Sequence, residues 1–494
     1  MISKNDYQNL CKVCDEILLS DKADNRILAN AWLHILREHP VVLKNYDYLF
    51  KYTNSLKLIN KDAKNLIRFA GIQIIRILQS IYNSKLWHTA QDLKESDILF
   101  VSHINNERLI GQDDDAYFHD LPKRLDIKNI SSSIALINHI KASNSKQLIA
   151  WSRNSIPRIV LDTTLSLLEE LKIIFSQIKS ISRLKMIMSE LNTPQKFRLP
   201  ACLQMISPET INALRISKQI ALLASKTKSK YLIITYEGHA WERLVLHEVR
   251  KVNPHIICIG YQNAPLIKYQ HASKRNLSPS YNLNFILSSG KIGEQEFKDS
   301  RELNNVTIKC LGSVQYRKHN LDKGIVQNSC LVIPDGILSE CLILFKFSLF
   351  CAKKMPMHKF VWRLHPLWNF KVLKNRSKIF KNLPNNVILS NESLDFDVER
   401  CDSVLYRGST AVINAINGGL KPIYYKRKKN EMSIDPIYQY NKDKAEVSKF
   451  SEFKESVKIP LTQEEKLALI DFSKKLYSSF DYSVLFDLFL ERNL

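Results

Sequence analysis

The chain has 494 residues, of which 45% are hydrophobic and 24% are charged. This composition is typical of a globular protein, and the length is enough for two to four domains. The 72 Lys and Arg residues outnumber the 49 Asp and Glu residues, and the net charge of +23 favours phosphorylated substrates or anionic lipids as partners. Nucleic acid is not expected as a partner, because the basic residues are scattered and carry no nucleic-acid-binding signature.

The sequence contains no segment that is predicted to enter or cross a membrane. The amino-terminal residues lack the apolar core of a signal peptide, and no run of about 18 apolar residues predicts a span. The nine Cys residues lack the spacing of a disulfide framework or a zinc site, and the closest pair, Cys11 and Cys14, falls in a helical segment. Reduced thiols fit the cytoplasm, so we expect a cytoplasmic protein whose contact with any membrane is peripheral.

The first half of the chain alternates between helical and strand-like patterns. Residues 1–95 predict a helical region, because apolar residues recur at helical spacing. Short apolar runs at 98–102 and 145–151 are typical of buried parallel strands. Residues 160–225 return to helical spacing, and their amphipathic stretch 161–178 would either press on a membrane or pack on its own domain.

A second series of strands begins at 230–235 and 255–260, which flank a predicted helix and form a β-loop-α-β unit. The polar stretch 276–282 contains Pro279 and is the expected linker between two domains. Further strands are predicted at 285–288, 307–311, 330–333, 359–363, 387–389, 403–406 and 422–425, with helices between several of them.

This alternation predicts an α/β fold. We expect two Rossmann-like, doubly wound domains that face a cleft, with a helical amino-terminal extension and a carboxyl-terminal helix. The expected boundaries are a helical region at 1–95, a first Rossmann-like domain at 96–275, a second one at 283–460 and the final helix at 461–494.

Three polar clusters follow predicted strands in the second half of the chain. They are Tyr236-Glu237-Gly238-His239, Arg363-Leu364-His365-Pro366 and Arg407-Gly408-Ser409-Thr410. Because ligands bind outside the carboxyl ends of the strands in open α/β sheets, these clusters are the candidate site.

The first cluster suggests proton transfer. Glu237 stands at a strand end, where Gly238 allows close backbone approach, so its carboxylate could serve as a general base. The alternative is an acid that complements the dipole of the helix starting near Ala240. His239 and Glu242 are rival bases, and the residues expected to contact the acceptor of the reaction are Trp241, Gln262 and Asn263.

The other two clusters suggest phosphate binding. Arg363 and His365 are two residues apart and share one face of an extended strand, where they would form a phosphate contact or a structural pair. Ser409 and Thr410 open a predicted helix, whose amino terminus would bind an anion or be capped in the ordinary way. The remaining residues expected to hold the phosphorylated ligand are Asp335, Gly336, Glu340, Arg407 and Gly408.

Two acidic patterns, Asp113-Asp114-Asp115 and Asp395-Phe396-Asp397, are of the kind that can hold a divalent ion against a diphosphate. The second precedes a predicted strand rather than following one, and short acidic loops are common, so no metal site is expected. The phosphate-binding glycine patterns GxxxxGK[ST] and GxGxxG are absent, which argues against nucleotide hydrolysis and dinucleotide redox chemistry.

At these residues the chain resembles the bacterial GT-B glycosyltransferases that use CMP-activated sugars, the sialyltransferases and Kdo transferases, and the "surface carbohydrate biosynthesis" proteins. In the bacterial sialyltransferases an acidic-acidic-Gly motif supplies the base, and an HP motif and a Ser-Ser/Thr motif bind the nucleotide phosphate. Tyr236-Glu237-Gly238 matches the first motif in part, because Tyr replaces one acid, and His365-Pro366 and Ser409-Thr410 match the other two. The resemblance spans roughly residues 230–425.

The resemblance implies a GT-B-like, inverting and metal-independent glycosyltransferase. Such an enzyme would transfer a sugar from a nucleotide-activated donor, which could be CMP-linked as Kdo is, to a growing bacterial capsule, lipopolysaccharide or O-antigen. The acceptor would bind the first Rossmann-like domain and the donor the second, at the inner face of the bacterial inner membrane, with no resident cofactor. The alternatives are a CDP-polyol phosphotransferase of the teichoic-acid type and a non-catalytic binding subunit of a polysaccharide assembly complex.

Overall fold

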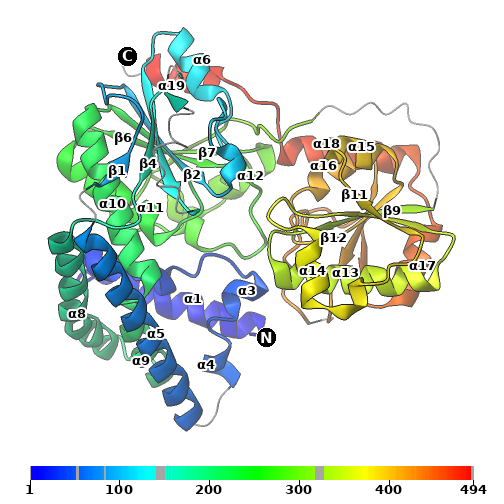
Figure 1. Ribbon diagram of the computed structural model, residues 1–494, viewed down its shortest axis with the longest axis horizontal. Coiled ribbons are helices and arrows are strands. Elements are labelled where there is room, and N and C mark those ends of the chain that lie inside the picture. Colours follow the sequence, from blue (N-terminus) through cyan, green and yellow to red (C-terminus); the bar gives the residue numbers. More distant parts are fainter. Residues whose placement is uncertain are drawn as a thin grey trace.

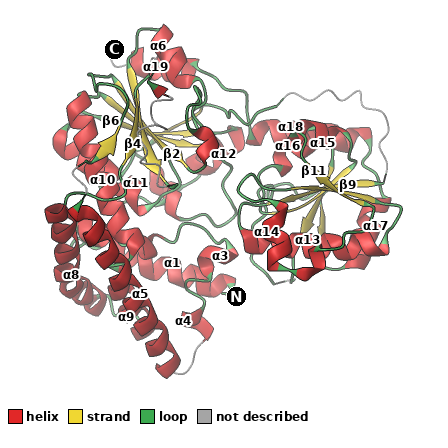
Figure 2. Ribbon diagram, viewed as in Figure 1, coloured by secondary structure: helices red, strands yellow, loops and turns green. Residues whose placement is uncertain are grey.

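The computed structural model describes residues 2–51, 55–82, 85–140, 151–152, 154, 156–317, 328–428 and 430–490. These residues form two α/β domains side by side, with a layer of helices against the first domain (Figure 1). Figure 2 shows that strands occupy the centre of each domain and helices surround them.

The helical layer is built from two stretches of sequence. The first contributes α1 (Lys4–Leu18), α2 (Asn25–Leu28), η1 (Ala31–His34), α3 (Pro40–Leu43), α4 (Tyr48–Lys51) and α5 (Ser55–Ile81). The second contributes α8 (Leu167–Glu190), α9 (Gln195–Gln204) and part of α10 (Pro208–Thr227). Apolar side chains from both stretches share one core, so the amino-terminal region is packed into the first domain.

The strands described in the first domain form an eight-stranded sheet in the order β1-β4-β3-β2-β5-β6-β7-β8. The strands are β1 (Trp87–His88), β2 (Ile98–Ile104), β3 (Ser132–Asn138), β4 (Arg158–Leu161), β5 (Tyr231–Thr235), β6 (Ile257–Gln262), β7 (Phe285–Ser288) and β8 (Thr307–Cys310). All neighbours are parallel except β1 and β4. The connecting helices and turns are η2 (Glu107–Leu109), α6 (Leu121–Ile127), α11 (Ala240–Val252), η4 (Ala272–Lys274), η5 (Pro279–Tyr281), α12 (Lys291–Lys298) and η6 (Arg301–Leu303).

The second domain holds a six-stranded sheet, counted over the described residues, in the order β11-β10-β9-β12-β13-β14. Its strands are β9 (Ser329–Pro334), β10 (Lys359–Arg363), β11 (Val387–Ser390), β12 (Ser403–Arg407), β13 (Lys421–Tyr425) and β14 (Ala445–Val447), and all are parallel. Its helices are α13 (Leu338–Lys354), α14 (Phe370–Arg376), η7 (Lys378–Phe380), α15 (Leu394–Glu399), α16 (Val412–Asn417) and α17 (Phe450–Lys458).

The carboxyl-terminal segment crosses back to the first domain. α18 (Gln463–Leu476) packs on α16 of the second domain and on α12 of the first, and α19 (Ser483–Leu490) follows it. Leu485 and Phe489 of α19 are buried with Tyr231 of β5 in the core of the first domain. Within the described part of the chain, no helix combines the length and the hydropathy that a membrane crossing requires.

Three segments differ from what the sequence predicts. Because β7 pairs with β6 and β8 pairs with β7, residues 285–288 and 307–310 belong to the first domain, and 276–282 is a loop of that domain rather than a linker. The side chain of Asn282 ties this loop down by accepting hydrogen bonds from Arg243 and the backbone of Leu277. The helix expected from 161 begins at Leu167, after β4, and most of the strand expected at 145–151 lies outside the described residues.

Each sheet has a point where the strand order reverses. In the first sheet the chain moves outward in one direction from β2 and in the other from β5, and in the second sheet it does so from β9 and β12. The loops that leave two such neighbouring strands diverge and open a crevice, which is the usual ligand site of doubly wound sheets. Both switch points carry residues from the predicted polar clusters.

Candidate functional site

The switch point of the first domain gathers a carboxylate, three imidazoles and an indole. Glu237 and His239 follow β5, and His103 lies near the end of the neighbouring β2. His103 Nε2 is 2.9 Å from Thr235 Oγ1, and its Nδ1 is 3.0 Å from His139 Nε2. The ring of Trp241 meets that of His103 edge to face, with centroids 5.6 Å apart. The structure thus brings Glu237, His239 and Trp241 together, and it adds His103 and His139, which sequence reasoning missed.

Glu237 is held as a carboxylate. Its Oε2 lies 2.8 Å from Arg37 Nη2 and 3.6 Å from His239 Nε2. Burial alone would raise the pKa of Glu237, but the charges of Arg37 and His239 outweigh it and lower the pKa to about 2. Burial would lower the pKa of His239, but Glu237 and Glu242 outweigh burial there and raise it. The lowered pKa of Glu237 and the raised pKa of His239 both favour an ion pair between these two side chains.

The other two histidines of the cluster are neutral. Burial, together with the neighbouring His139 and His239, lowers the pKa of His103 to about 3. Burial and His239 also lower the pKa of His139. Both ring nitrogens of His103 are engaged, by Thr235 and by His139, whereas Nδ1 of His139 has no hydrogen-bond partner among the described residues. The neutral ring of His139 can therefore orient a hydroxyl-bearing ligand without adding charge.

Glu242 organises the loop that carries Glu237. Its carboxylate accepts hydrogen bonds from the backbone N–H groups of Glu237, Gly238 and His239, at distances of 2.6–3.1 Å. The side chain is buried, which raises its pKa to about 7. Because both oxygens serve the amino terminus of α11, Glu242 has a structural role, and Glu237 is the acid of this loop that remains beside the crevice.

Gly238 is required by the packing of this loop. Its φ of +88° is unfavourable for other residues, and a Cβ atom there would lie 2.3 Å from the carbonyl carbon of Ala272. The close backbone approach expected at this glycine therefore occurs with the loop at 268–275 rather than with a ligand.

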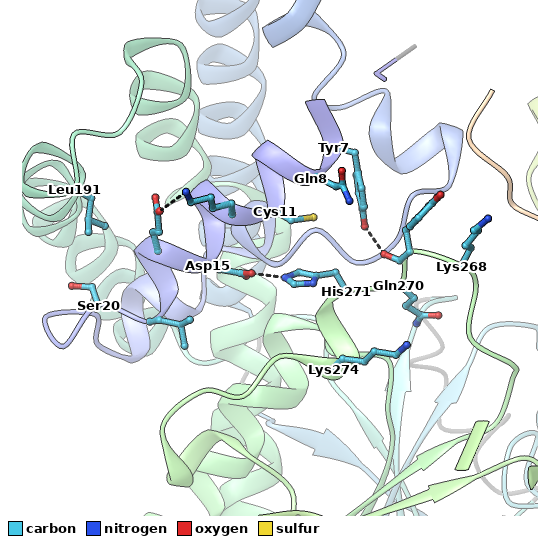
Figure 3. Close-up of a pocket in the computed structure, with 14 residues that line it drawn as sticks. Tyr7, Gln8, Cys11, Asp15, Ser20, Leu191, Lys268, Gln270, His271 and Lys274 are labelled. Carbon is cyan, nitrogen blue, oxygen red and sulfur yellow. Dashed lines mark hydrogen bonds and ion pairs between the residues drawn. The ribbon is translucent and has the colours of Figure 1, made fainter. Parts of the chain in front are cut away.

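The amino-terminal helix supports that loop from the other side. A pocket of about 810 Å³ lies between α1 and the loop, and polar contacts bridge it (Figure 3). Asp15 binds His271 at 2.5 Å and Arg275 at 2.6 Å, and the Tyr7 hydroxyl donates to the carbonyl of Tyr269 at 2.8 Å. Through these contacts α1 holds the loop at 268–275, against which Gly238 packs.

The switch point of the second domain brings together Asp335, Gly336, His365 and Gly408. Asp335 and Gly336 follow β9, and Gly408 follows β12, with the position of its missing Cβ 3.1 Å from Asp335 Oδ2. A Cβ at Gly336 would lie 3.1 Å from the ring of His365. The two glycines therefore allow Asp335 and His365 to pack closely against this loop. Ser409, which is buried, and Thr410 lie just before the short helix α16.

The two arginines expected to bind phosphate are engaged elsewhere. Arg407 is fully buried, 2.5 Å from Glu340 and 2.7 Å from Glu431. Arg363 donates to Asp397 at 3.0 Å and to the carbonyl of Glu392 at 2.5 Å. Both guanidinium groups and the Glu340 carboxylate serve ion pairs within the second domain, and Glu340 also lines a pocket of about 210 Å³ that it shares with residues from the segment 38–47.

The remaining predicted residues lie near the site or serve the fold. Gln262 is buried and faces α12, with its Oε1 3.4 Å from the position that a Cβ of Gly293 would take, and Asn263 is half-buried after β6. In the acidic patterns, Asp115 accepts from the Ser102 hydroxyl, and buried Asp397 binds arginines. No three His, Cys, Asp or Glu side chains gather as a metal site in the parts of the chain that are described.

Three consecutive residues of the amino-terminal region join the two switch points. We call residues 37–39, which lie between η1 and α3, the strap. Arg37 binds Glu237 at 2.8 Å, Glu38 accepts from the backbone N–H of Tyr269 at 3.0 Å, and His39 Nε2 lies 3.1 Å from Asp335 Oδ2. The strap was not predicted from the sequence. Its only indication there is the polar triplet Arg37-Glu38-His39 directly before Pro40, which interrupts the helical pattern.

No family model and no curated protein matches the chain. Solved structures similar to it include the glycotransferase of kitacinnamycin, at 11% identity and a TM-score of 0.49, covering 82% of this chain and 100% of that one. A putative UDP-N-acetylglucosamine 2-epimerase from Listeria monocytogenes is similar at 12% identity and a TM-score of 0.47, covering 81% and 97%. MurG from Acinetobacter baumannii is similar at 9% identity and a TM-score of 0.42, covering 80% and 99%. With TM-scores below 0.5 these structures resemble the chain in outline only, and its GT-B-like fold follows from its own strand order and paired switch points.

Proposed function

We propose that the protein is a glycosyltransferase that uses a nucleotide-activated sugar. The proposal rests mainly on the strap, which contacts both switch points. The switch point of the first domain carries the Glu237–His239 pair, and that of the second domain carries the loop with Gly336 and Gly408. Glycosyl transfer needs a base for the acceptor hydroxyl and donors that stabilise the leaving phosphate. The acceptor is assigned to the first domain and the nucleotide to the second.

Glu237 is the proposed base and His239 its closest rival. Glu237 is ionised and belongs to the same cluster as the neutral imidazole of His139, which can hold a hydroxyl, and both facts support this assignment. Glu242 is excluded as the base, because its carboxylate accepts hydrogen bonds from three backbone N–H groups. On the donor side, His365, Gly336 and Gly408 are proposed to contact the nucleotide phosphate.

The finer proposal is a CMP-linked donor, such as Kdo, and a growing bacterial surface glycan as acceptor. It rests on the similarity of Tyr236-Glu237-Gly238, His365-Pro366 and Ser409-Thr410 to the motifs of the CMP-sugar transferases. A test is calorimetry of the wild-type protein with CMP, CDP, UDP and GDP, followed by product analysis with the matching sugar nucleotides. Binding of CMP above the others and transfer of a sugar to a glycan support the proposal. Transfer of a polyol phosphate, or binding without any turnover, contradicts it.

A peripheral contact with anionic lipid belongs to the same proposal, and α5 supports it. An outward apolar stripe runs along this helix, formed by Ile67 (73% exposed), Ile74, Ile75, Leu78 and Ile81. The exposed charges among the described side chains of α5 are all basic, namely Lys61, Lys64 and Arg68. Apolar residues flanked by cations are typical of helices that lie on anionic membranes. The neighbouring α8 adds exposed Leu168, Phe175 and Ile178 from the stretch expected at 161–178.

Vesicle flotation tests this contact. The wild-type protein is expected to float with phosphatidylglycerol vesicles at low salt and less with neutral phosphatidylcholine vesicles. The double substitution Ile74→Glu/Leu78→Glu should abolish flotation, whereas Ile127→Glu, at an exposed isoleucine of α6, should not. Equal flotation of the two variants would contradict the role of α5.

A further inference from the structure

The proposed transfer leaves one requirement unassigned: a cation or strong donor for the phosphate that departs. Arg407 is fully buried between two glutamates, and Arg363 is held by Asp397 and a backbone carbonyl. All three guanidinium nitrogens of Arg407 are engaged by Glu340, Glu431 and the carbonyl of Tyr425, and Nη1 of Arg363 is shared between Asp397 and the carbonyl of Glu392. We therefore look for the charge on another element, at the junction of the two domains.

Arg37 meets that requirement. Its guanidinium is 39% exposed, and within the described residues its hydrogen bonding is to Glu237 through Nη2 alone. A guanidinium has five N–H donors arranged to bind two oxygens of a phosphate at once. Arg37 thus has donors to spare, and it lies directly beside the proposed base.

His39 presents a second donor to the other domain. Its Nδ1 accepts a hydrogen bond from the backbone N–H of Val41, so in the neutral ring the proton is on Nε2, and Nε2 donates to Asp335. Asp335 in turn lies against Gly408 and near His365, the loop assigned to the nucleotide. Arg37 and His39 are two residues apart, about 7 Å in an extended segment, which is within the length of a diphosphate with its flanking oxygens.

We propose that Arg37 and His39 form the phosphate clamp of this protein, and that a nucleoside diphosphate or a nucleotide sugar binds by replacing Glu237 and Asp335 as their partners. This inference rests on the proposed function, which it extends by naming the residues that bind phosphate. The ligand is recognised by its phosphate oxygens, which accept from the Arg37 fork and from His39 Nε2–H.

The clamp connects donor binding to the proposed base. While Arg37 pairs with Glu237, its charge is a main reason why the carboxylate is a weak proton acceptor. When Arg37 turns to phosphate, Glu237 loses that stabilisation and becomes a stronger base for the acceptor hydroxyl. The position of Glu38 between the two clamp residues, bonded to the backbone of Tyr269, anchors the strap while its neighbours exchange partners.

Calorimetry with CMP, CDP, UDP, the corresponding nucleosides and inorganic pyrophosphate tests the clamp, and CMP is included because the proposed CMP-linked donor carries a single phosphate. Arg37→Ala and His39→Ala should each weaken diphosphate and pyrophosphate binding at least tenfold and leave nucleoside binding within twofold. Arg37→Lys keeps the charge without the fork and should fall between Arg37→Ala and the wild type. Arg183→Ala is the matched control, because Arg183 is a similarly exposed arginine that pairs with Asp24 far from the switch points, and its affinities should equal those of the wild type.

The possible outcomes test the clamp and the proposed function independently. Unchanged diphosphate affinity in Arg37→Ala and His39→Ala, with clear binding by the wild type, overturns the clamp and leaves nucleotide-sugar use intact. Equal losses for nucleosides and diphosphates also overturn it, because they indicate a merely structural strap. Absence of binding of every nucleotide and of pyrophosphate to the wild type overturns the clamp and the proposed function together. If Arg37→Ala fails to fold, the comparison of Arg37→Lys and His39→Ala with the wild type decides in the same way.

Discussion

Replacement of Arg407 by methionine should destabilise the second domain strongly. The guanidinium is fully buried and binds Glu340, both oxygens of Glu431 and the carbonyl of Tyr425 at 2.5–3.1 Å. Removing one partner of a buried ion pair costs about 3–5 kcal/mol, because a buried charge is left uncompensated. Here that charge is Glu340, which has its ion pair with Arg407. For a domain of this size that cost corresponds to a fall of about 6–20 °C in melting temperature. A residue that contacted only a ligand would change the melting temperature of the free protein little.

Thermal unfolding, followed by circular dichroism, measures this effect, and a rescue variant isolates its cause. In Arg407→Met/Glu340→Gln/Glu431→Gln the buried charges are removed together, so much of the lost stability should return. Glu431 also binds Arg427, which is 30% exposed and can be solvated when that partner is lost. A wild-type melting temperature for Arg407→Met, accompanied by weaker nucleotide binding, would show that Arg407 serves the ligand and would refute this reasoning.

Three further outcomes are expected. Glu237→Gln should lower the transfer rate about 10²–10⁴-fold with little change in nucleotide affinity, and near-normal turnover measured with the identified donor would move the base role to His239. Burial raises the pKa of Glu38 from 4.5 to about 7, so as the pH rises from 4.5 through 7 the wild type should lose up to about 3 kcal/mol more stability than Glu38→Gln; urea unfolding of both proteins at pH 5 and pH 8 measures the difference. Gly238→Ala should cost about 1–3 kcal/mol through its strained φ and its clash with Ala272, whereas Gly71→Ala, where nothing lies within 4 Å in the helix α5, should stabilise by about 0.5–1 kcal/mol; equal melting temperatures would contradict this account.

The parts of the fold that depend on local pattern could be predicted from the sequence. The runs 231–234 and 360–362 are continuous and apolar, and they form the buried parts of β5 and β10, which are covered on both faces of their sheets. The polar residues after them were correctly expected at the strand ends. The pairing of strands depends on contacts between distant segments, which explains why β7 and β8 were expected in the second domain.

The roles of individual side chains were harder to predict for the same reason. Arg407 and Glu237 have similar sequence contexts, each following an apolar strand and preceding a glycine. They differ in the partners that the fold supplies. Arg407 is buried in ion pairs with Glu340 and Glu431, whereas Glu237 is bound by Arg37, 200 residues away, at the switch point of the first domain. A strand-end position therefore predicts nearness to the ligand site, and only the long-range partners show which side chain can act there.

These contacts make the helical amino-terminal region a part of the candidate site. Its first helix holds the loop on which Gly238 rests, through Asp15 and its two partners. Its strap then reaches both switch points within three residues, at Glu237 and Asp335. The domains also contact each other elsewhere, for example where Glu296 of α12 binds Tyr438 and Gln439. The strap adds a connection directly at the two switch points, so it limits domain motion where a ligand would bind. A ligand that competes for Arg37 and His39 would therefore loosen this connection and occupy its place, so that binding and domain movement depend on the same two side chains.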